Sequence, residues 1–390
     1  MFYIGIDIAK RTHEICILDA SGEPVDSPKK VHNTTVGAEK LMAALVHLSL
    51  TPSDCLVGME ATGHYWLGFY GFLLEKGFNV KVINPIVTDA FRSMHVRKVK
   101  TDSVDALVIA KVLMFGEYTE SPAASGETLA LRQLCRFRTF EIDTCSDLKR
   151  KAIALLDQIF PEYETLFSDT FGVSSREVLI SYTTPEDLEK ISTRKLTNLL
   201  AKASKGRFGR EKALQLKEAA TNSFGITIAV DAFAFQLRQL LEQISFIEKQ
   251  VADLDRKITE YMRETGTYIT TIPGIGPVLG AVILGEIGDI HRFPDGSRLV
   301  AYAGIDASVS QSGTFLGNQM HMSKRGSPYL RRALYMAASV AAFHDPELSA
   351  YYQRLRDRGK HHKVAIGAVA RKLCFIIFTI LTDNRPYEKR

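Results

Sequence analysis

The first ten residues constrain the fold of this chain more than any other stretch. Residues 2–10 read FYIGIDIAK, an apolar, β-branched run interrupted by a single carboxylate, Asp7. Such a run predicts a central β-strand, and a buried strand tolerates a carboxylate only when its charge is paired or holds a cation. Residues 12–18 predict a second strand, and residues 19–24 (DASGEP) predict the turn that follows it. Asp7 is therefore the first candidate for a functional group.

The following segments alternate between strand and helix patterns. We expect strands at 29–36, 55–59 and 79–85, and helices at 37–49, 64–74 and from 101 onward. This alternation predicts an α/β sheet covered by helices. A strand, hairpin and further strand at the start of a sheet is shared by RNase H-like nucleases and by actin-like or sugar-kinase ATPases. Asp7 alone does not distinguish these classes, but the sequence contains no second glycine-rich phosphate loop of the kind an ATPase would use.

Four acidic residues are placed where they can share metal ions. Glu60 ends the strand at 55–59, while Asp102 and Asp105 are three residues apart and so lie on one face of a helix. We expect all of them to converge with Asp7, where mutual repulsion would raise their pKa values unless cations lay between them. Two Mg²⁺ ions about 3.5–4 Å apart are the usual solution, and Mn²⁺ is a possible substitute. Taken singly, Asp102 is more simply a helix cap, Asp105 a surface acid and Glu60 a strand-end residue, but the joint placement favours a metal site.

The C-terminal part of the chain is basic. From Met320 onward, 14 Lys and Arg stand against 5 Asp and Glu, a net charge of +9, which leaves −4 for the preceding residues of a chain whose total is +5. A polyanion partner and a merely solvated basic surface explain this charge equally well. The candidate nucleic-acid contacts are Lys324, Arg325, Arg331 and Arg332 near a helix start, together with Gly274 and Gly276 of a Pro-Gly-x-Gly turn like that of helix-hairpin-helix DNA-binding modules.

Two long helical patterns occupy the middle of the chain. Residues 126–160 interleave apolar positions with basic ones, which either track a nucleic-acid backbone or are simply solvated: Arg132, Arg136, Arg138, Lys149, Arg150 and Lys151. From Leu237 to Tyr261 the apolar residues are three and four apart, as in a coiled-coil seam. We expect an intramolecular hairpin with 126–160 that also contributes to self-association. Residues 161–225 predict a helical insertion without a chemical motif.

A serine-rich stretch supplies a second candidate catalytic site. Ser308, Ser310 and Ser312 occupy alternate positions, and Gly313 next to Ser312 allows a phosphodiester to approach closely. A serine hydroxyl is a weak nucleophile until its proton is removed or the phosphate is polarised. No histidine neighbours these serines in the sequence, so metal ions held by the acidic set would have to supply that activation if the two domains meet.

Several of these motifs together resemble one family. The stretches IGIDIAK (4–10), EATG (60–63), VINP (82–85) and KTDSVDA (100–106) resemble the RuvC-like domain of IS110 family transposases. Residues 302–313, 322–326 and 330–334 resemble the C-terminal transposase domain of the same family. The resemblance implies an RNase H-like (RuvC-like) domain that binds Mg²⁺ through Asp7, Glu60, Asp102 and Asp105. It also implies that the nucleophilic serine, which becomes covalently linked to DNA, is Ser312.

The resemblance implies a DNA transposase or recombinase that cleaves, exchanges and rejoins strands of donor and target double-stranded DNA. It further implies a structured guide RNA encoded by the element, and a homo-oligomer in which a dimer pairs into a tetramer. The alternative is a metal-only, structure-specific DNA nuclease resembling Holliday-junction resolvases, in which Ser312 is structural. A non-catalytic DNA-binding protein built on the turn at 273–276 would leave the acidic set unexplained.

Composition bounds the remaining expectations. The five cysteines are scattered and never form a CxxC pair, which argues against both a disulfide framework and a zinc site. We find no apolar run of bilayer length and no signal sequence, so we expect a cytoplasmic, nucleoid-associated bacterial or archaeal protein without membrane contact. We expect three parts: an α/β metal-binding nuclease domain at 1–125, a helical coiled-coil and insertion region at 126–265, and an all-α transposase domain at 266–390.

Overall fold

The computed structural model of the chain describes residues 1–26, 29–60, 63–93, 102–116, 126–307, 311–312, 315–316 and 321–388, with the backbone alone at 86, 102–103, 311–312 and 315–316. The chain divides into two units. The first comprises Met1–Leu129 with Ile287–Asp289, and the second comprises Ala130–Glu286 with Ile290–Arg390.

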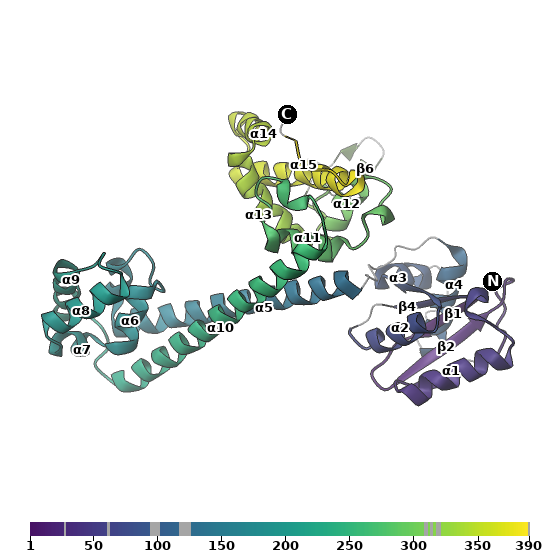
Figure 1. Cartoon of the computed structure of the whole chain (residues 1–390), viewed down its shortest axis with the longest axis horizontal. Helices are drawn as coiled ribbons and strands as arrows, with labels where there is room; N and C mark the ends of the chain where they lie inside the picture. Colours follow the sequence, from purple (N-terminus) through teal and green to yellow (C-terminus); the bar gives the residue numbers. More distant parts are fainter. Residues whose placement is uncertain are drawn as a thin grey trace. The chain divides into compact units, whose positions relative to one another are not determined.

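The first unit is built on a five-stranded sheet (Figure 1). Its strands are β1 (Phe2–Asp7), β2 (Thr12–Leu18), β3 (Lys29–His32), β4 (Cys55–Glu60) and β5 (Asn79–Ile83), in the order β3-β2-β1-β4-β5. β2 is antiparallel to both β1 and β3, whereas β4 is parallel to both β1 and β5. The strands expected from the sequence are all present, and β1 is central because its hairpin with β2 and its parallel pairing with β4 occupy both of its edges.

Helices cover both faces of this sheet. α1 (Thr35–His47) and α2 (Trp66–Glu75) pack on the face to which Ile4 and Ile6 point. α3 (Pro85–Ser93) and α4 (Asp102–Phe115) pack on the opposite face, where Tyr3 and Ile83 contact them. The period-two alternation of side chains along β1 accounts for this division between the two faces.

Two glycines allow α4 to lie directly on the central strands. Gly5 and Gly58 are register partners in β1 and β4. A Cβ atom at Gly5 would lie 2.1 Å from the carbonyl oxygen of Ala106, and one at Gly58 would lie 2.7 Å from Cδ1 of Leu113. The backbone of α4 thus occupies the space of a missing side chain on β1, which fixes the depth of this helix over the sheet.

Replacement of Gly5 by alanine is expected to destabilise the protein by about 3 kcal/mol or more, because the clash is with backbone atoms that cannot rotate away. Urea denaturation followed by tryptophan fluorescence measures this, since Trp66, the one tryptophan, lies in α2 of the same unit. Gly68→Ala in α2 is the matched control. A Cβ there meets nothing within 4 Å, so this substitution should stabilise the helix by about 0.5–1 kcal/mol. Equal effects of the two substitutions would contradict the packing described for α4.

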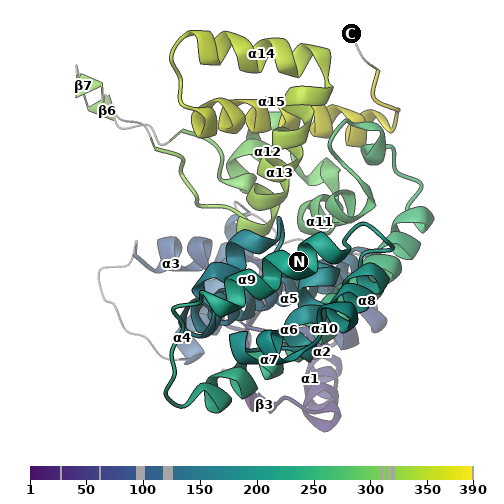
Figure 2. The same ribbon diagram turned by 90° about the vertical axis from the view of Figure 1, so that its left-hand side faces the viewer.

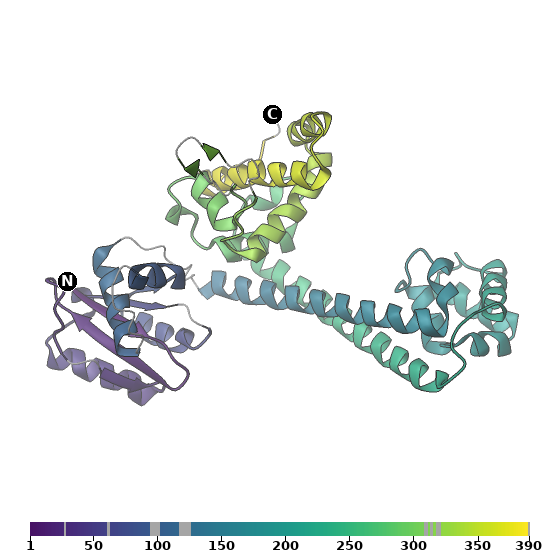
Figure 3. The same ribbon diagram turned by 180° about the vertical axis from the view of Figure 1, so that it is seen from behind.

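The second unit contains two long helices that pack against each other (Figure 3). These are α5 (Gly126–Ile159) and α10 (Val230–Glu264), which share a buried core that includes Leu156, Leu237 and Ile244. Ion pairs also join them, among them Lys149 Nζ to Glu248 Oε1 at 2.7 Å. The expected intramolecular hairpin is confirmed, whereas its contribution to self-association stays a prediction.

The interpretation of α5 as a basic, nucleic-acid-tracking or solvated helix is wrong for most of its charges. Arg132 is 8% exposed and donates from Nε to the carbonyl of Gly285 at 2.7 Å. Four of the others are paired with acids: Arg136 with Glu286, Arg138 with Asp255, Lys149 with Glu248 and Arg150 with Asp147. Lys151 is exposed. Most of these partners come from α10 and from the C-terminal helices, more than 90 residues away, so the sequence pattern of α5 alone did not reveal them.

A group of short helices, here called the helical tip, occupies residues 161–229 between α5 and α10 (Figures 1 and 2). It consists of η2 (Pro161–Leu166), α6 (Val173–Ser181), α7 (Pro185–Lys190), α8 (Thr193–Ala203) and α9 (Arg210–Thr221). Tyr163 is fully buried at its centre and donates its hydroxyl to the carbonyl of Ser175 at 2.8 Å. Leu188, Leu196 and Leu200 are also fully buried, in an apolar core that is continuous with that of α5 and α10. The expected helical insertion is confirmed.

The C-terminal part of the second unit is helical, as expected. Its helices are α11 (Pro277–Ile287), α12 (Gly296–Ala303), α13 (Pro328–His344), α14 (Pro346–Asp357) and α15 (His362–Asp383), with short turns η3 (Ile269–Thr271) and η4 (Ile290–Arg292).

By length and composition, α15 is apolar enough to cross a membrane, contrary to the expectation that no such segment exists. It packs against α12, α13 and α14, with Ile366 and Leu373 fully buried. This is the environment of a core helix.

All five cysteines are buried and unpaired. Burial raises the pKa of Cys135 to about 12 and that of Cys55 to about 11. Such thiols remain protonated at neutral pH and are poor metal ligands, in agreement with the absence of a CxxC pair.

Candidate active site

Two of the four predicted acids lie at one edge of the sheet in the first unit. Asp7 is the last residue of β1 and Glu60 is the last residue of β4. These strands are parallel neighbours in which Ile6 is the register partner of Met59. The next residues along the two strands are therefore Asp7 and Glu60, which follow at the same carboxyl edge.

The third acid is supplied by α4. Asp105 immediately precedes Ala106, whose carbonyl oxygen lies over Gly5 of β1. Asp105 therefore lies next to the contact over Gly5, and Asp7 is two residues further along the strand from Gly5. The Asp105 side chain is 14% exposed. Asp102 is the first residue of α4, one turn before Asp105, and its side chain lies outside the described residues.

Helix α3 provides partners for two of these acids. The hydroxyl of Thr88, which is 1% exposed, donates to Glu60 Oε2 at 2.9 Å. Arg92 lies one turn further along α3, and its Nη2 is 2.9 Å from Asp105 Oδ1. Sequence reasoning missed both residues. The one available signal was their i, i+4 spacing on the helix that follows β5, which places them on a single face.

The contact of Arg92 with Asp105 is an ion pair without an aligned hydrogen bond. Asp105 Oδ1 and Arg92 Nε are both buried, and neither has a hydrogen-bond partner among the described residues. The guanidinium of Arg92, 2.9 Å away, compensates the charge of Asp105 Oδ1 without an aligned hydrogen bond. A carboxylate oxygen held in this way keeps lone pairs for a divalent metal, for which carboxylates are preferred ligands.

The described residues do not form a complete metal-ligand cluster. No three Asp, Glu, His or Cys side chains among them are grouped closely enough to hold an ion. Asp7 and Glu60 both have interactions within the protein. Of the predicted set, the structure brings Asp7, Glu60 and Asp105 to the same edge without closing them around a common centre.

In the second unit, two crossing segments carry the loop that contains the predicted nucleophile. Residues 302–307 and 322–327 lie side by side: Ser323 N donates to the Asp306 carbonyl at 2.9 Å, and Ala307 forms a β-bridge with Met322. A Cβ at Gly326 would lie 1.7 Å from the Tyr302 carbonyl oxygen. Only glycine permits this crossing, which holds both ends of the intervening segment together.

Ser312 lies in a short hairpin between these ends. β6 (Gln311–Ser312) is antiparallel to β7 (Phe315–Leu316), with Ser312 as the register partner of Phe315. Ser312 is thus the last residue of its strand before the two-residue connection. The alternative serines, Ser308 and Ser310, lie outside the described residues, as does Gly313.

A buried glutamate anchors the base of this segment. Glu286 is 2% exposed and accepts from Arg136 of α5, with Nε to Oε1 at 2.7 Å and Nη2 to Oε2 at 3.0 Å. Its Oε2 also accepts from the hydroxyl of Ser327 at 2.8 Å. Ser327 caps the N-terminus of α13, so Glu286 links α5 and α11 to the start of the helix that follows the predicted catalytic loop.

The predicted basic contacts are of two kinds. Lys324 and Arg325 are exposed and have no ion-pair partner among the described residues. By contrast, Arg331 donates to the carbonyl of Ala303 at 3.2 Å, and Arg332 pairs with Asp143 of α5 at 2.9 Å. The first pair is therefore free to contact phosphate, whereas the second pair is held by internal contacts.

Of the two glycines in the Pro-Gly-x-Gly turn, one is packed against another helix and the other is exposed. Gly274 has φ +87° and faces α13, where an added Cβ would lie 2.5 Å from the carbonyl of Ala337. Gly276 is exposed, with nothing within 4 Å of an added Cβ. Gly274 is required for packing, and only Gly276 presents open backbone to a ligand.

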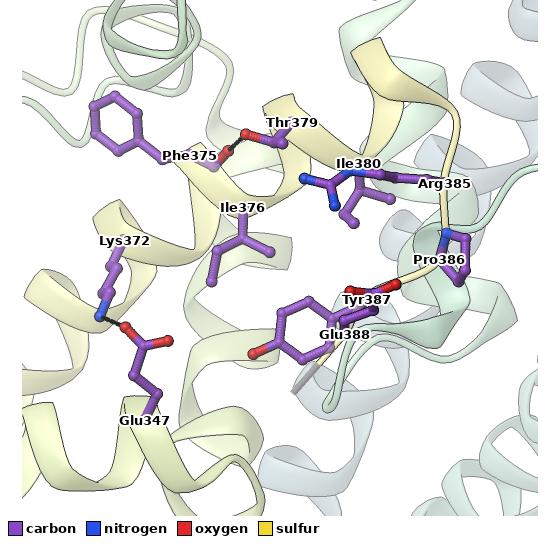
Figure 4. A pocket seen from close by; sticks show the side chains of 10 residues that line it. All are labelled: Glu347, Lys372, Phe375, Ile376, Thr379, Ile380, Arg385, Pro386, Tyr387 and Glu388. Atoms are coloured by element: carbon purple, nitrogen blue, oxygen red, sulfur yellow. Dashed lines mark hydrogen bonds and ion pairs between the residues drawn. The ribbon is translucent and has the colours of Figure 1, made fainter. Parts of the chain in front are cut away.

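A separate pocket of about 290 Å³ lies between α15 and the residues that follow it (Figure 4). Its polar lining includes the Glu347–Lys372 ion pair, and Tyr387 beside it donates its hydroxyl to Asp345 Oδ2 at 2.7 Å. None of the predicted catalytic residues lines this pocket.

Comparison with known proteins agrees with these observations. A model for IS110-type DEDD transposases matches residues 4–161, and a model described as the transposase IS116/IS110/IS902 family matches residues 266–353. The chain is 26% identical to the 44.8 kDa protein of insertion element IS116 from Streptomyces clavuligerus, over 99% of this chain and 96% of that protein.

Two further relatives have functional names. The chain is 27% identical to the putative transposase of the IS117 mini-circle from Streptomyces coelicolor, over 93% of this chain and 89% of the relative. It is 24% identical to the pilin gene-inverting protein of Moraxella bovis, over 100% of this chain and 98% of the relative. Together with the fold, these matches define a DNA transposase or recombinase. The chain belongs to the IS110 family of transposases.

Replacement of Glu286 by glutamine is expected to destabilise the protein by roughly 3 kcal/mol, because Arg136 loses a buried, bidentate counter-charge. Guanidinium denaturation followed by circular dichroism measures the loss in the helical second unit. Glu347→Gln serves as the control, since its pair with Lys372 is partly exposed and is worth at most about 1 kcal/mol. A loss at Glu286 no larger than that at Glu347 would show that this cluster does not hold α5 to α11.

Proposed function

We propose that this protein is an insertion-sequence recombinase that cleaves, exchanges and rejoins strands of donor and target DNA. The observation that carries the proposal is the carboxyl edge of the first unit's sheet, where parallel strands end in Asp7 and Glu60 and α4 adds Asp105. A sheet of order β3-β2-β1-β4-β5 with helices on both faces supports an RNase H-like, RuvC-like assignment for this unit. The family membership supports the same reaction.

The acids suit Mg²⁺, with Mn²⁺ as a substitute. Asp7, Glu60, Asp102 and Asp105 would hold the metal, and Oδ1 of Asp105, which faces Arg92 without an aligned hydrogen bond, would be one of its ligands. Bound there, the metal would polarise a phosphodiester and stabilise the negative charge that develops on it. Thr88 and Arg92 orient Glu60 and Asp105 from α3, so these carboxylates are held in place before a metal arrives.

Ser312 is the proposed nucleophile of the second unit. Its hydroxyl would lose a proton, form a bond to the phosphorus of a DNA strand, and break the bond from that phosphorus to the neighbouring sugar oxygen, which leaves as a hydroxyl. The phosphodiester energy is then conserved for rejoining. The hairpin at 311–316 and the exposed cations Lys324 and Arg325 near its base support the assignment.

Guide RNA and oligomeric state belong to the same proposal. A structured RNA encoded by the element would bind basic surfaces of the protein and specify the donor and target sequences. Coordinated cutting of two duplexes requires at least two copies of the chain, so we propose a dimer that pairs into a tetramer.

A covalent-trapping experiment tests the nucleophile. Purified protein is incubated with RNA from the flanks of the element, labelled donor and target DNA, and Mg²⁺, and the products are resolved on a denaturing gel. The wild type should give a protein-linked DNA band that Ser312→Ala abolishes. Asp7→Asn should reduce the band by at least about a hundredfold, since it removes a ligand of the proposed metal.

The same gel distinguishes the alternative. A metal-only nuclease would cut DNA by water attack, so the wild type would give cleaved DNA without a linked band, and Ser312→Ala would cut equally well. Ser310→Ala is the matched control, because it removes a hydroxyl from the same loop. Loss of the band in Ser310→Ala alone would move the assignment from Ser312 to Ser310.

A metal-binding measurement tests the acidic site independently of catalysis. Arg92→Met should raise the affinity for Mn²⁺ by about tenfold, because it removes a positive charge that competes with the ion for Asp105. The same substitution should lower the stability of the metal-free protein by about 1–3 kcal/mol. Isothermal titration calorimetry with Mn²⁺ measures the first effect and thermal unfolding in a chelator measures the second.

Lys40→Met on α1 is the control for the charge change, since α1 covers the opposite face of the sheet. It should leave the affinity for Mn²⁺ within about twofold of the wild type. Equal affinities of the Arg92 variant and the wild type would exclude Asp105 as a metal ligand that Arg92 neutralises.

A further inference from the structure

We propose that the helical tip is a docking surface for the phosphodiester backbone of duplex DNA. This inference rests on the proposed function only in that the protein acts on nucleic acid. The residues that carry it lie within 190–217, in a segment whose sequence holds no catalytic or metal-ligand motif.

Charge is sharply divided along the sequence of the tip. Residues 161–189 contain seven Asp and Glu and one Arg, whereas residues 190–217 contain nine Lys and Arg and one Glu. The net charge is therefore −6 for residues 161–189 and +8 for residues 190–217. Concentration of like charge is unfavourable for the isolated protein, because the cations repel one another. It becomes favourable when a polyanion lies across the positive half.

Most cations of the second half are exposed, whereas Lys190, Lys212 and Lys217 have partners within the tip. Six of them have no ion pair among the described residues: Arg194, Lys195, Lys202, Lys205, Arg207 and Arg210. In the long helices α5 and α10 the opposite holds, since their basic residues are mostly paired, as in Arg138 with Asp255 and Arg256 with Asp253. The tip thus leaves unpaired the type of side chain that these two helices mostly neutralise.

These cations lie on α8, on the loop that follows it and at the start of α9, and Figure 2 shows these helices. Lys195 and Lys202 are seven residues apart on α8 and so share a face, separated by about 10 Å along the helix axis. Leu196 and Leu200 are buried in the core of the tip, so the face of α8 that carries Lys195 and Lys202 is directed to solvent. Such a separation allows side chains to reach successive phosphates along a groove.

The loop between α8 and α9 continues this surface. It reads KGRFGR from Lys205 to Arg210, and Gly206 and Gly209 are exposed, with nothing within 4 Å of an added Cβ. A phosphate can therefore approach the exposed backbone closely on either side of Arg207. Phe208 between the glycines packs into the core of the tip, so the loop is anchored while its cations remain outside.

The chemistry recognised is the row of phosphates along duplex DNA, the nucleic acid to which the family membership points. The side chains that carry the proposal are all cations, so we expect contacts to the backbone without base specificity. The tip would then contribute sequence-independent binding affinity, in addition to the sequence-specific contacts made elsewhere in the protein.

The salt dependence of binding tests this proposal. Affinity for a 30-base-pair duplex is measured by fluorescence anisotropy without Mg²⁺ between 50 and 200 mM salt, for the full-length protein and the triple variant Lys195→Gln, Lys202→Gln, Arg207→Gln. Each lost phosphate contact removes about 0.9 from the slope of log K against log salt, so the slope should become shallower by about 2–3. Affinity at the lowest salt should fall by about tenfold or more.

The control triple variant Arg150→Gln, Arg256→Gln, Lys257→Gln removes the same charge from exposed positions that are already ion-paired. It should leave the slope unchanged. Equal losses in the two triple variants, or no loss in either, would overturn the proposal. A loss confined to a duplex RNA of the same length, with the binding of duplex DNA unchanged, would also overturn it.

This experiment is independent of strand cleavage. Repeating it in the Ser312→Ala background should give the same difference between the two triple variants, even if the serine assignment fails. Circular dichroism should show unchanged helix content in both triple variants, because all six side chains are exposed and none contributes to the core.

Discussion

The backbone of α4 lies directly on Gly5 of β1, and the arrangement of the acidic edge depends on this contact. Asp105 precedes the residue whose carbonyl occupies the space above Gly5, and Asp7 lies two residues further along the strand. One backbone contact therefore sets the positions of both acids. Packed interiors deform little, so a carboxylate attached to such a contact is placed more reproducibly than one on a surface loop.

Compensation of charge then decides which side chains are available for chemistry. In the first unit Arg92 neutralises Asp105, and in the second Arg136 neutralises Glu286. The second pair is complete, with aligned hydrogen bonds and a serine that fills the remaining acceptor site. The first pair leaves one carboxylate oxygen without a hydrogen bond. A complete pair stabilises a junction between helices, whereas an incomplete one remains ready for a stronger cation.

The basic side chains also divide into those with partners within the protein and those without. Most cations of α5 are satisfied internally, by acids on α10 and α11 and by backbone carbonyls. Lys324, Arg325 and the cluster around residues 194–210 are not. Net charge counted from the sequence drew attention to the C-terminal region and overlooked the tip, because the acidic half of the tip cancels its basic half in any long window.

The sequence by itself determined the strands of the first unit, the edge at which Asp7 and Glu60 end, the long helical pair and the family. Each follows from local periodicity or from a contiguous motif. Only the tertiary structure decided that Thr88 and Arg92 contact the acids, that Arg132, Arg136 and Arg138 of α5 have partners from distant segments, and that six cations of the tip have no ion pair among the described residues. These properties depend on partners brought together from distant segments by packing, and no local pattern encodes the identity of such partners.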